Sequence, residues 1–226
     1  MKYERTYHYI ESPGATNDDK ISHNTNALLG REIVITEKLD GSNSGFKVSG
    51  PYGRSHAAPT ENAWDRNLWD IYNSGMKDWL EFYSLEWNKE ISLFGENMYA
   101  IHSIVYQNLT RYFYAFGIRM DETWVSWDNL VELCDSIELN NHPSNIQTVP
   151  LLYRGVVNTQ KELNKIIDNL MNSGSTYGSV IEGLVIRWAD EIHTSDWKDA
   201  VQKIVRPNHV TTDVHWTRNW EKAELV

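Results

Sequence analysis

The spacing of apolar residues along the chain predicts both strands and helices. Six short runs are either apolar or alternate between apolar and polar residues, as strands do. They are residues 33–39, 45–48, 91–93, 112–118, 181–187 and 203–206. The first two are expected to form a pair, because residues 41–44 between them have the composition of a turn.

Three longer segments have apolar residues at helical spacing. They are residues 63–82, 126–137 and 161–172. Gly75 weakens the middle of the first predicted helix, and Ser126 can cap the N-terminus of the second. Thr159 and Glu162 form a capping box at the start of the third helix, and Gly174 should end it. Strands mixed with a few helices favour an α+β fold over a doubly wound sheet. A chain of 226 residues without repeats is long enough for one domain with a real core.

Composition narrows the classes of protein. The net charge of −10 argues against a broad nucleic-acid surface, so any phosphate-binding track must be local. The single cysteine, Cys134, excludes an internal disulfide and a zinc cluster of cysteines, and is typical of a reducing, cytoplasmic location. It lies on the apolar stripe of the second predicted helix, so we expect it in the core. We expect no membrane association, because no apolar run approaches the ~20 residues of a membrane span and the N-terminus lacks a signal peptide.

The stretch Lys38-Leu39-Asp40-Gly41 carries the strongest chemical signal. A lysine at the end of a strand, followed by a carboxylate and a glycine turn, suits a nucleophile. Its neutral amine is needed for attack, and partial burial with cationic neighbours would lower its pKa. Four residues recur by chance, so this stretch alone is weak evidence.

Further motifs follow Lys38 along the chain. Phe94-Gly95-Glu96-Asn97 closes the third predicted strand, Tyr112–Ile118 is aromatic, and Lys203-Ile204-Val205-Arg206 has a cation at each end. Glu182 lies inside an apolar strand, where a charge is costly unless it is paired or binds a metal. This order resembles the covalent nucleotidyltransferases, which are ATP-dependent DNA ligases, RNA ligases and mRNA capping enzymes. It is most similar to the phage-type nick-sealing RNA ligases, over roughly residues 33–206.

The resemblance implies a nucleotide site. Lys38 would attack the α-phosphorus of ATP and hold AMP through a phosphoramidate bond, and Glu37 beside it would bind the nucleotide. Glu96 would accept hydrogen bonds from the ribose hydroxyls, and Phe113 would stack on adenine. Lys203 would grip the α-phosphate, and Lys38, Lys203 and the strand glutamate Glu182 would be the catalytic residues.

The resemblance also implies contacts to a metal and to substrate phosphates. Glu182 and Asp40 would hold Mg²⁺, with Mn²⁺ as an alternative. Asn43, Arg54 and Arg206 would contact phosphate groups of the substrate, although Arg206 departs from the K-x-K pattern of the phage-type enzymes.

The expected architecture is a nucleotidyltransferase domain, the ATP-grasp-like adenylation domain of ligases, with antiparallel sheets and flanking helices. It would span residues 1–226, with 207–226 as a short tail and no OB domain. Gly117 stands where the family commonly has aspartate, which weakens the match around Phe113.

The leading hypothesis is an ATP-dependent RNA ligase that joins 3′-hydroxyl and 5′-phosphate ends of RNA through enzyme-lysyl-AMP and an adenylylated 5′ end. An accessory protein or domain acting in trans would be a further partner. The alternatives are a minimal ATP-dependent DNA ligase and a catalytically inactive module that binds nucleotide or RNA. The intact set Lys38, Glu96, Glu182 and Lys203 argues against the inactive module.

Overall fold

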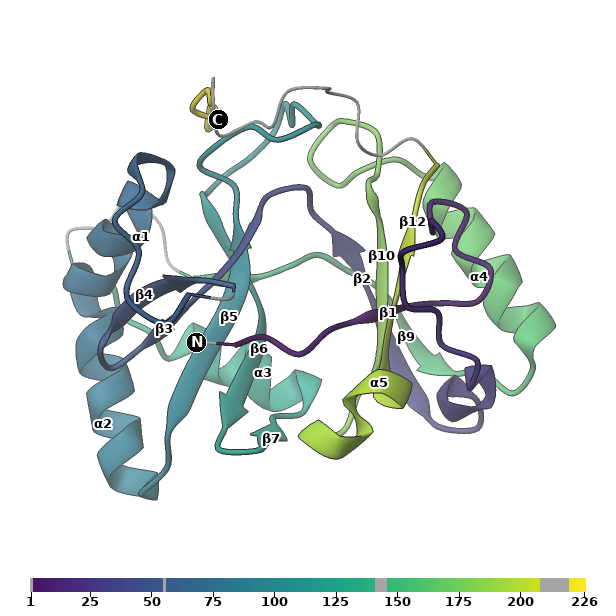
Figure 1. Cartoon of the computed structure of the whole chain (residues 1–226), viewed down its shortest axis with the longest axis horizontal. Helices are drawn as coiled ribbons and strands as arrows, with labels where there is room; N and C mark the ends of the chain where they lie inside the picture. The colour runs from purple at the N-terminus through teal and green to yellow at the C-terminus, as the bar shows by residue number, and fades with distance from the viewer. Residues whose placement is uncertain (1, 55, 141–145, 208–219) are drawn as a thin grey trace.

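The strands of the protein form two sheets that face each other (Figure 1). The computed structural model describes residues 2–54, 56–140, 146–207 and 220–226. The five-stranded sheet has the order β1 (Tyr7–His8), β12 (Val201–Val205), β10 (Gly183–Trp188), β2 (Glu32–Lys38) and β9 (Leu151–Val156). All of its neighbours are antiparallel except β1 and β12.

The second sheet has seven strands. Its order is β11 (Ile192–His193), β7 (Thr123–Trp124), β6 (Phe113–Met120), β5 (Ile91–Asn97), β3 (Ser42–Lys47) and β4 (Gly50–Gly53). A short strand, β8 (Gln147–Thr148), runs parallel to β6. The expected α+β class with mainly antiparallel sheets is confirmed.

The expected pairing of the first two strands is wrong. β2 pairs with β10 and β9, whereas β3 pairs with β4 and β5 in the other sheet. β2 is apolar on both faces, with Ile33 and Ile35 in one core and Val34 in the other. Such a strand is stabilised as an interior strand buried on both sides. The segment after Lys38 therefore crosses from one sheet to the other, and the proposed nucleophile lies at this crossing.

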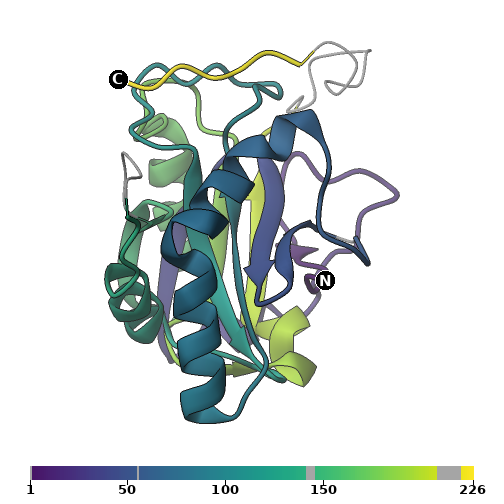
Figure 2. The same cartoon turned by 90° about the vertical axis from the view of Figure 1, so that its left-hand side faces the viewer.

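The α-helices among the described residues are α1 (Arg66–Ile71), α2 (Lys77–Trp87), α3 (Trp127–Asp135), α4 (Gln160–Asn172) and α5 (Trp197–Ala200). α1 and α2 lie on the outer side of the seven-stranded sheet and α4 on the outer side of the five-stranded sheet, whereas α5 lies between the two sheets at the bottom of the view (Figures 1 and 2). Leu163 and Ile167 of α4 pack against the five-stranded sheet in one buried cluster. Residues of α1, α2 and α3, including the buried Cys134, form a larger cluster with the seven-stranded sheet.

The three expected helices are confirmed. In the first, Tyr72–Met76 is a wider turn between α1 and α2, where Gly75 has a φ of 148° and a Cβ would lie 2.2 Å from the Glu138 carbonyl oxygen. In the second, Ser126 accepts a hydrogen bond from the Asn129 amide. In the third, the Thr159 side chain accepts one from the Glu162 amide, which satisfies a free donor of the first turn.

The described part of the tail returns to the loop after β5. Ile101 donates its amide hydrogen to the Glu221 carbonyl, and Ala223 donates to the Tyr99 carbonyl, both at 2.9 Å. Residues 208–219 of the tail lie outside the described residues. Within the described residues, no helix combines the length and the apolar character needed to cross a membrane.

Candidate active site

A cavity of about 630 Å³ opens between the two sheets. Alternation along the five-stranded sheet turns every second side chain of its three central strands toward this cavity. These side chains are Thr36 and Lys38 of β2, Val185 and Arg187 of β10, and Val201 and Lys203 of β12. The cavity therefore collects side chains from segments that are far apart in the sequence.

Lys38 and Glu182 form the central ion pair of the site. Lys38 Nζ lies 2.5 Å from Glu182 Oε1, and the Glu182 side chain is only 6% exposed. The β2–β10 register produces this contact, because Gly183 pairs with Lys38 and so places Glu182 beside it. The second oxygen, Glu182 Oε2, is buried without a hydrogen-bond partner among the described residues.

The expectation of a lowered pKa for Lys38 is wrong. Burial lowers the pKa of Lys38, but the surrounding carboxylates of Glu182, Glu96 and Asp40 outweigh this effect and the net shift is upward. Burial also raises the pKa of Glu182, and it raises the pKa of Glu96 to about 8. The site is thus a partly buried group of acids around one lysine.

Lys203 and Arg54 add cations to the cavity wall. Burial, followed by repulsion from Lys38, lowers the pKa of Lys203, although Asp19 and Glu182 oppose the shift. Clustered cations in a partly buried cavity favour an anionic ligand such as a phosphate. Arg206, in contrast, does not line the cavity; it follows β12 on the face opposite Lys203, so the structure does not bring it to this site.

Glu37 lines the cavity next to Lys38. Its carboxylate accepts hydrogen bonds from the Ser175 hydroxyl at 2.5 Å and from the Thr176 amide at 2.9 Å. Both donors belong to the segment between α4 and β10, so Glu37 holds this segment against the end of β2, next to Lys38.

The structure places the carboxylate of Asp40, which we expected to hold a metal, outside the cavity lining. Its Oδ2 accepts hydrogen bonds from the amides of Ser103 and Ile104, at 2.7 and 2.8 Å. The Asp40 amide in turn donates a hydrogen bond to the Tyr106 hydroxyl oxygen, at a distance of 2.9 Å. Asp40 is absent from the cavity lining, and its carboxylate anchors the segment after β5. Sequence reasoning missed these partners, because backbone amides leave no residue-type signal.

Glu96 and Asn43 face each other across β5 and β3. Glu96 Oε1 accepts a hydrogen bond from the Gly41 amide at 3.2 Å, and both Glu96 and Asn43 line the cavity. Asn43 Oδ1 is buried and has no partner among the described residues. Buried polar atoms are normally satisfied, so this oxygen is available to a ligand.

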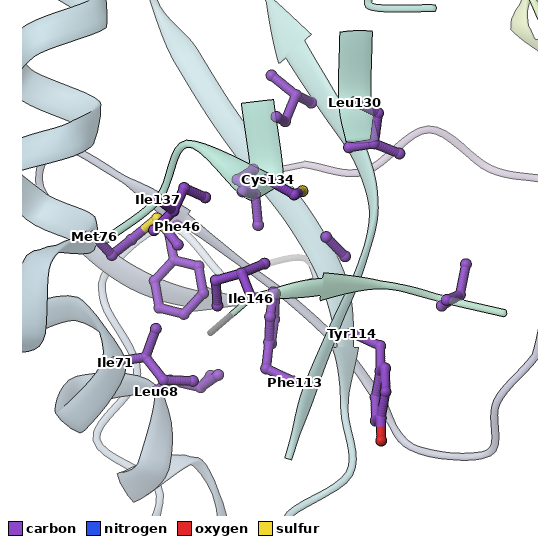
Figure 3. Close-up of a cluster of buried hydrophobic side chains, with 14 of the residues drawn as sticks. Phe46, Leu68, Ile71, Met76, Phe113, Tyr114, Leu130, Cys134, Ile137 and Ile146 are labelled. Atoms are coloured by element: carbon purple, nitrogen blue, oxygen red, sulfur yellow. The ribbon is translucent and has the colours of Figure 1, made fainter. Parts of the chain in front are cut away.

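Phe113 does not lie in the cavity, which corrects the expected stacking residue. It is 2% exposed, and its ring packs against Phe46 in the core at a centroid distance of 5.0 Å (Figure 3). Phe116 lines the cavity instead. Alternation places residues 113 and 116 on opposite faces of β6, so Phe116 faces the cavity when Phe113 faces the core. Phe116 is also the extra residue of a β-bulge, because Phe94 pairs with Gly117 and Gly95 with Ala115.

Gly117, the departure from the family pattern, has a packing reason. A Cβ at this position would lie 2.7 Å from the Trp124 ring. The Trp124 side chain is fully buried, so it has no room to move away. An aspartate at 117 would therefore not fit this arrangement.

Sequence reasoning also missed several residues that line the cavity. They are Tyr3, Thr6, Trp127, Val149, Arg187 and Trp197. Arg187 is 3% exposed and donates to the carbonyl oxygens of Val125, at 2.8 Å, and Phe116, at 3.4 Å. It thereby links the two sheets at one end of the cavity.

Among the described residues, no group of three or more His, Cys, Asp or Glu side chains could hold a metal ion. Magnesium does not require such a group, because it often uses one or two carboxylates together with phosphate oxygens and water. The free Oε2 of Glu182 supplies one such oxygen.

Comparison with known proteins identifies the family. The RNA ligase family model matches residues 31–205, and no curated protein matches the sequence. An alanine mutant of Naegleria gruberi RNA ligase with ATP and Mn aligns at a TM-score of 0.59 and 20% identity, over 88% of this chain and 58% of that chain. An apo alanine mutant aligns at 0.58 and 21% identity, over 80% and 51%.

The Naegleria gruberi RNA ligase with PPi aligns at a TM-score of 0.53 and 20% identity, over 91% of this chain and 62% of that chain. This chain thus spans less than two thirds of each of the three structures. At such identities the likeness shows a shared fold. The family model, in contrast, covers well over half of the sequence, and the chain belongs to the RNA ligase family.

Proposed function

We propose that this protein is an ATP-dependent RNA ligase that adenylylates itself on Lys38, transfers AMP to a 5′-phosphate and joins that end to a 3′-hydroxyl. The observation that carries the proposal is the placement of the Lys38 amine in a cavity wall beside Glu182, with Lys203 and Arg54 lining the same cavity. A nucleophile, a carboxylate and cations for phosphate are the groups that this reaction requires.

The cavity suits ATP in volume and chemistry. Its volume of about 630 Å³ lies in the range of small-molecule sites, ~300–1,000 Å³. Phe116 and Val185 offer apolar contacts for a base, Glu96 offers a carboxylate for ribose hydroxyls, and the cations suit a triphosphate. Structures of the Naegleria gruberi RNA ligase with ATP and Mn and with AMP and Mn support the same choice of nucleotide and metal.

In the first step, the Lys38 nitrogen forms a bond to the α-phosphorus, and the bond from that phosphorus to the oxygen of pyrophosphate breaks. The lysine must first lose a proton, and Glu182 is in contact to accept it. The raised pKa of Glu182 makes this carboxylate a better base than an exposed one. Lys203 and Arg54 stabilise charge on the phosphates. A bound Mg²⁺ or Mn²⁺ would neutralise further phosphate charge, and Glu182 Oε2 is the oxygen that would hold it.

In the later steps, AMP passes from Lys38 to the 5′-phosphate oxygen, and the 3′-hydroxyl then displaces AMP. Asn43 and Arg54 would contact the substrate phosphate, and their position in the lining of the cavity that holds Lys38 supports this assignment. The free Oδ1 of Asn43 is an acceptor, so it suits a hydroxyl or a water next to that phosphate.

The test uses nicked duplexes of one sequence in which the strands at the nick are RNA or DNA. Purified protein, ATP and Mg²⁺ are incubated with each duplex, and the products are separated on a denaturing gel. We expect joining at RNA ends and accumulation of adenylylated RNA in an Asn43→Ala variant. Efficient joining of DNA ends alone would show a DNA ligase. Absence of joining, with pre-adenylylated 5′ ends supplied, would contradict a ligase.

A further inference from the structure

Residues 2–6, named here the strap, form a wall of the cavity although they lie outside the part of the chain that the family model matches. Tyr3 and Thr6 of the strap line the cavity. In Figure 1 the strap is the purple segment that runs from the N-terminus, near the seven-stranded sheet, to β1. It therefore crosses the space between the two sheets.

The strap is attached at both ends. On the side of the seven-stranded sheet, the Tyr3 amide donates to the Arg54 carbonyl at 3.4 Å, and Arg119 of β6 forms an ion pair with Glu4 at 2.6 Å. On the other side, β1 pairs with β12, where His8 is the partner of Lys203. Because these attachments lie on different sheets, the strap helps to fix the separation of the cavity walls.

The Tyr3 ring lies in an aromatic cluster. Its centroid is 5.3–5.4 Å from the rings of Phe94, Phe116, Trp124 and Trp197. Burial raises the pKa of the Tyr3 hydroxyl, which forms a hydrogen bond with the Thr6 side chain. Of the four neighbouring rings, Phe116 is the bulge residue that lines the cavity and is the proposed support for the base.

We propose that Tyr3 is a positioning residue for the nucleotide: its ring holds Phe116 in place, and the strap keeps the cavity at the width that the nucleotide needs. This inference rests on the proposed function, because it concerns the same site. The contacts of Tyr3 are with the strap, Arg54 and the aromatic cluster, whereas the chemical step depends on the pair Lys38 and Glu182. Loss of the Tyr3 ring should thus weaken nucleotide binding without slowing the step that follows binding.

The experiment compares Tyr3→Ala and Tyr3→Phe with a matched control, Tyr83→Ala. Tyr83 also lies among aromatic rings, on α2 and away from the cavity. Binding of α,β-methylene-ATP, which cannot transfer its AMP group, is measured by calorimetry, and the concentration dependence of self-adenylylation is measured with ATP. Loss of the ring that supports Phe116 should weaken nucleotide binding about tenfold, which corresponds to about 1.4 kcal/mol.

We expect Tyr3→Ala to raise the Kd for the analogue and the KM for ATP about tenfold while kcat stays within about twofold. Tyr3→Phe keeps the ring and should restore both constants, and Tyr83→Ala should leave both unchanged. A folded Tyr3→Ala protein with the wild-type Kd and KM would overturn the proposal. A lower kcat at an unchanged KM would also overturn the proposal, because a smaller fraction of folded protein produces that pattern.

Hydrogen exchange of the wild-type protein decides the case in which Tyr3→Ala does not fold. The amides of residues 3–6 should exchange more slowly when the analogue is bound, and an unchanged rate would overturn the proposal. If ATP labels the wild-type protein and Tyr3→Ala has the same Kd for the analogue as wild type, the positioning role of the strap is refuted and the proposed function is not. Wild-type protein that binds the analogue without being labelled would refute the adenylylation step, and the Kd comparison would still decide the role of Tyr3. Failure to bind the analogue would refute both.

Discussion

The Lys38 amine and the Glu182 carboxylate are held 2.5 Å apart by the pairing of β2 with β10. Lys38 is the last residue of β2 and Glu182 directly precedes β10, and both strands are central in the five-stranded sheet, so the sheet fixes the positions of both side chains. Such support suits groups that must keep a reactive geometry. The pair also explains why the pKa of Lys38 is raised, which favours the charged form of the lysine.

Removing the Glu182 carboxylate should severely impair self-adenylylation. Glu182→Ala leaves the lysine without its proton acceptor, and general-base catalysis typically contributes ~10²–10⁴-fold to a rate. The rate is measured from incorporation of label from α-labelled ATP. Glu32→Ala serves as the control, because Glu32 forms an exposed ion pair with Arg154 at a distance from the cavity. Labelling of Glu182→Ala within about twofold of wild type would contradict the role.

The rate of self-adenylylation should rise with pH. The carboxylates around Lys38 raise its pKa, so the neutral amine is scarce at low pH and becomes more abundant as pH increases. Glu182→Gln removes one of these charges and should move the rise to lower pH, although its maximal rate is reduced. The measurement is the initial labelling rate between about pH 6 and pH 10, a range that approaches the ordinary lysine pKa of ~10.4. A wild-type rate that does not change over this range would contradict the account.

Glu96 should make the stability of the fold depend on pH. Its pKa is about 8 in the folded protein, compared with an ordinary value of ~4.3 for glutamate in an unfolded chain. At pH values between these two pKa values, the unfolded chain has lost the Glu96 proton while the folded protein keeps it. The free energy of unfolding therefore falls as pH rises. The side chain of Glu96→Gln cannot release a proton. The Tm of this variant minus the Tm of wild type should therefore be larger at pH 8.5 than at pH 5.5. Thermal melts at the two pH values test this, and a constant difference in Tm would refute it.

Sequence patterns located Lys38, Glu96, Glu182 and Lys203 because each lies on or directly beside a strand whose apolar pattern is clear. The strand register then brings them together, as in the pairing of Val185 with Lys203. The pairing of the first two predicted strands failed, because local turn composition does not reveal that β2 needs neighbours on both sides.

The exchange of Phe113 for Phe116 has a different cause. Alternation places Phe113 and Phe116 on opposite faces of β6, but an aromatic strand does not show in its sequence which face packs on the core. The role of Asp40 was also hidden, because its partners are main-chain amides 63 and 64 residues further along the chain. In both cases the missing information lies in tertiary contacts.

The two phenylalanines of β6 should respond differently to substitution. Phe116→Ala should raise the KM for ATP while the fold stays intact, because this ring is partly exposed in the cavity. Phe113→Ala should lower the free energy of unfolding by ~3–5 kcal/mol, the usual cost of deleting a buried ring. Denaturant melts and self-adenylylation kinetics on both variants separate the two effects. The opposite pattern would show that Phe113 is the base-stacking ring.

The most direct test of the account is covalent labelling at Lys38. Purified protein is incubated with Mg²⁺ and α-labelled ATP or GTP, and the protein is run on a denaturing gel. We predict a labelled band with ATP and not with GTP, and its loss in Lys38→Ala. Lys47→Ala is the control, because Lys47 lies on β3 in an ion pair with Glu90 and does not line the cavity. A Lys38→Ala protein that is labelled as fully as wild type would contradict the central claim.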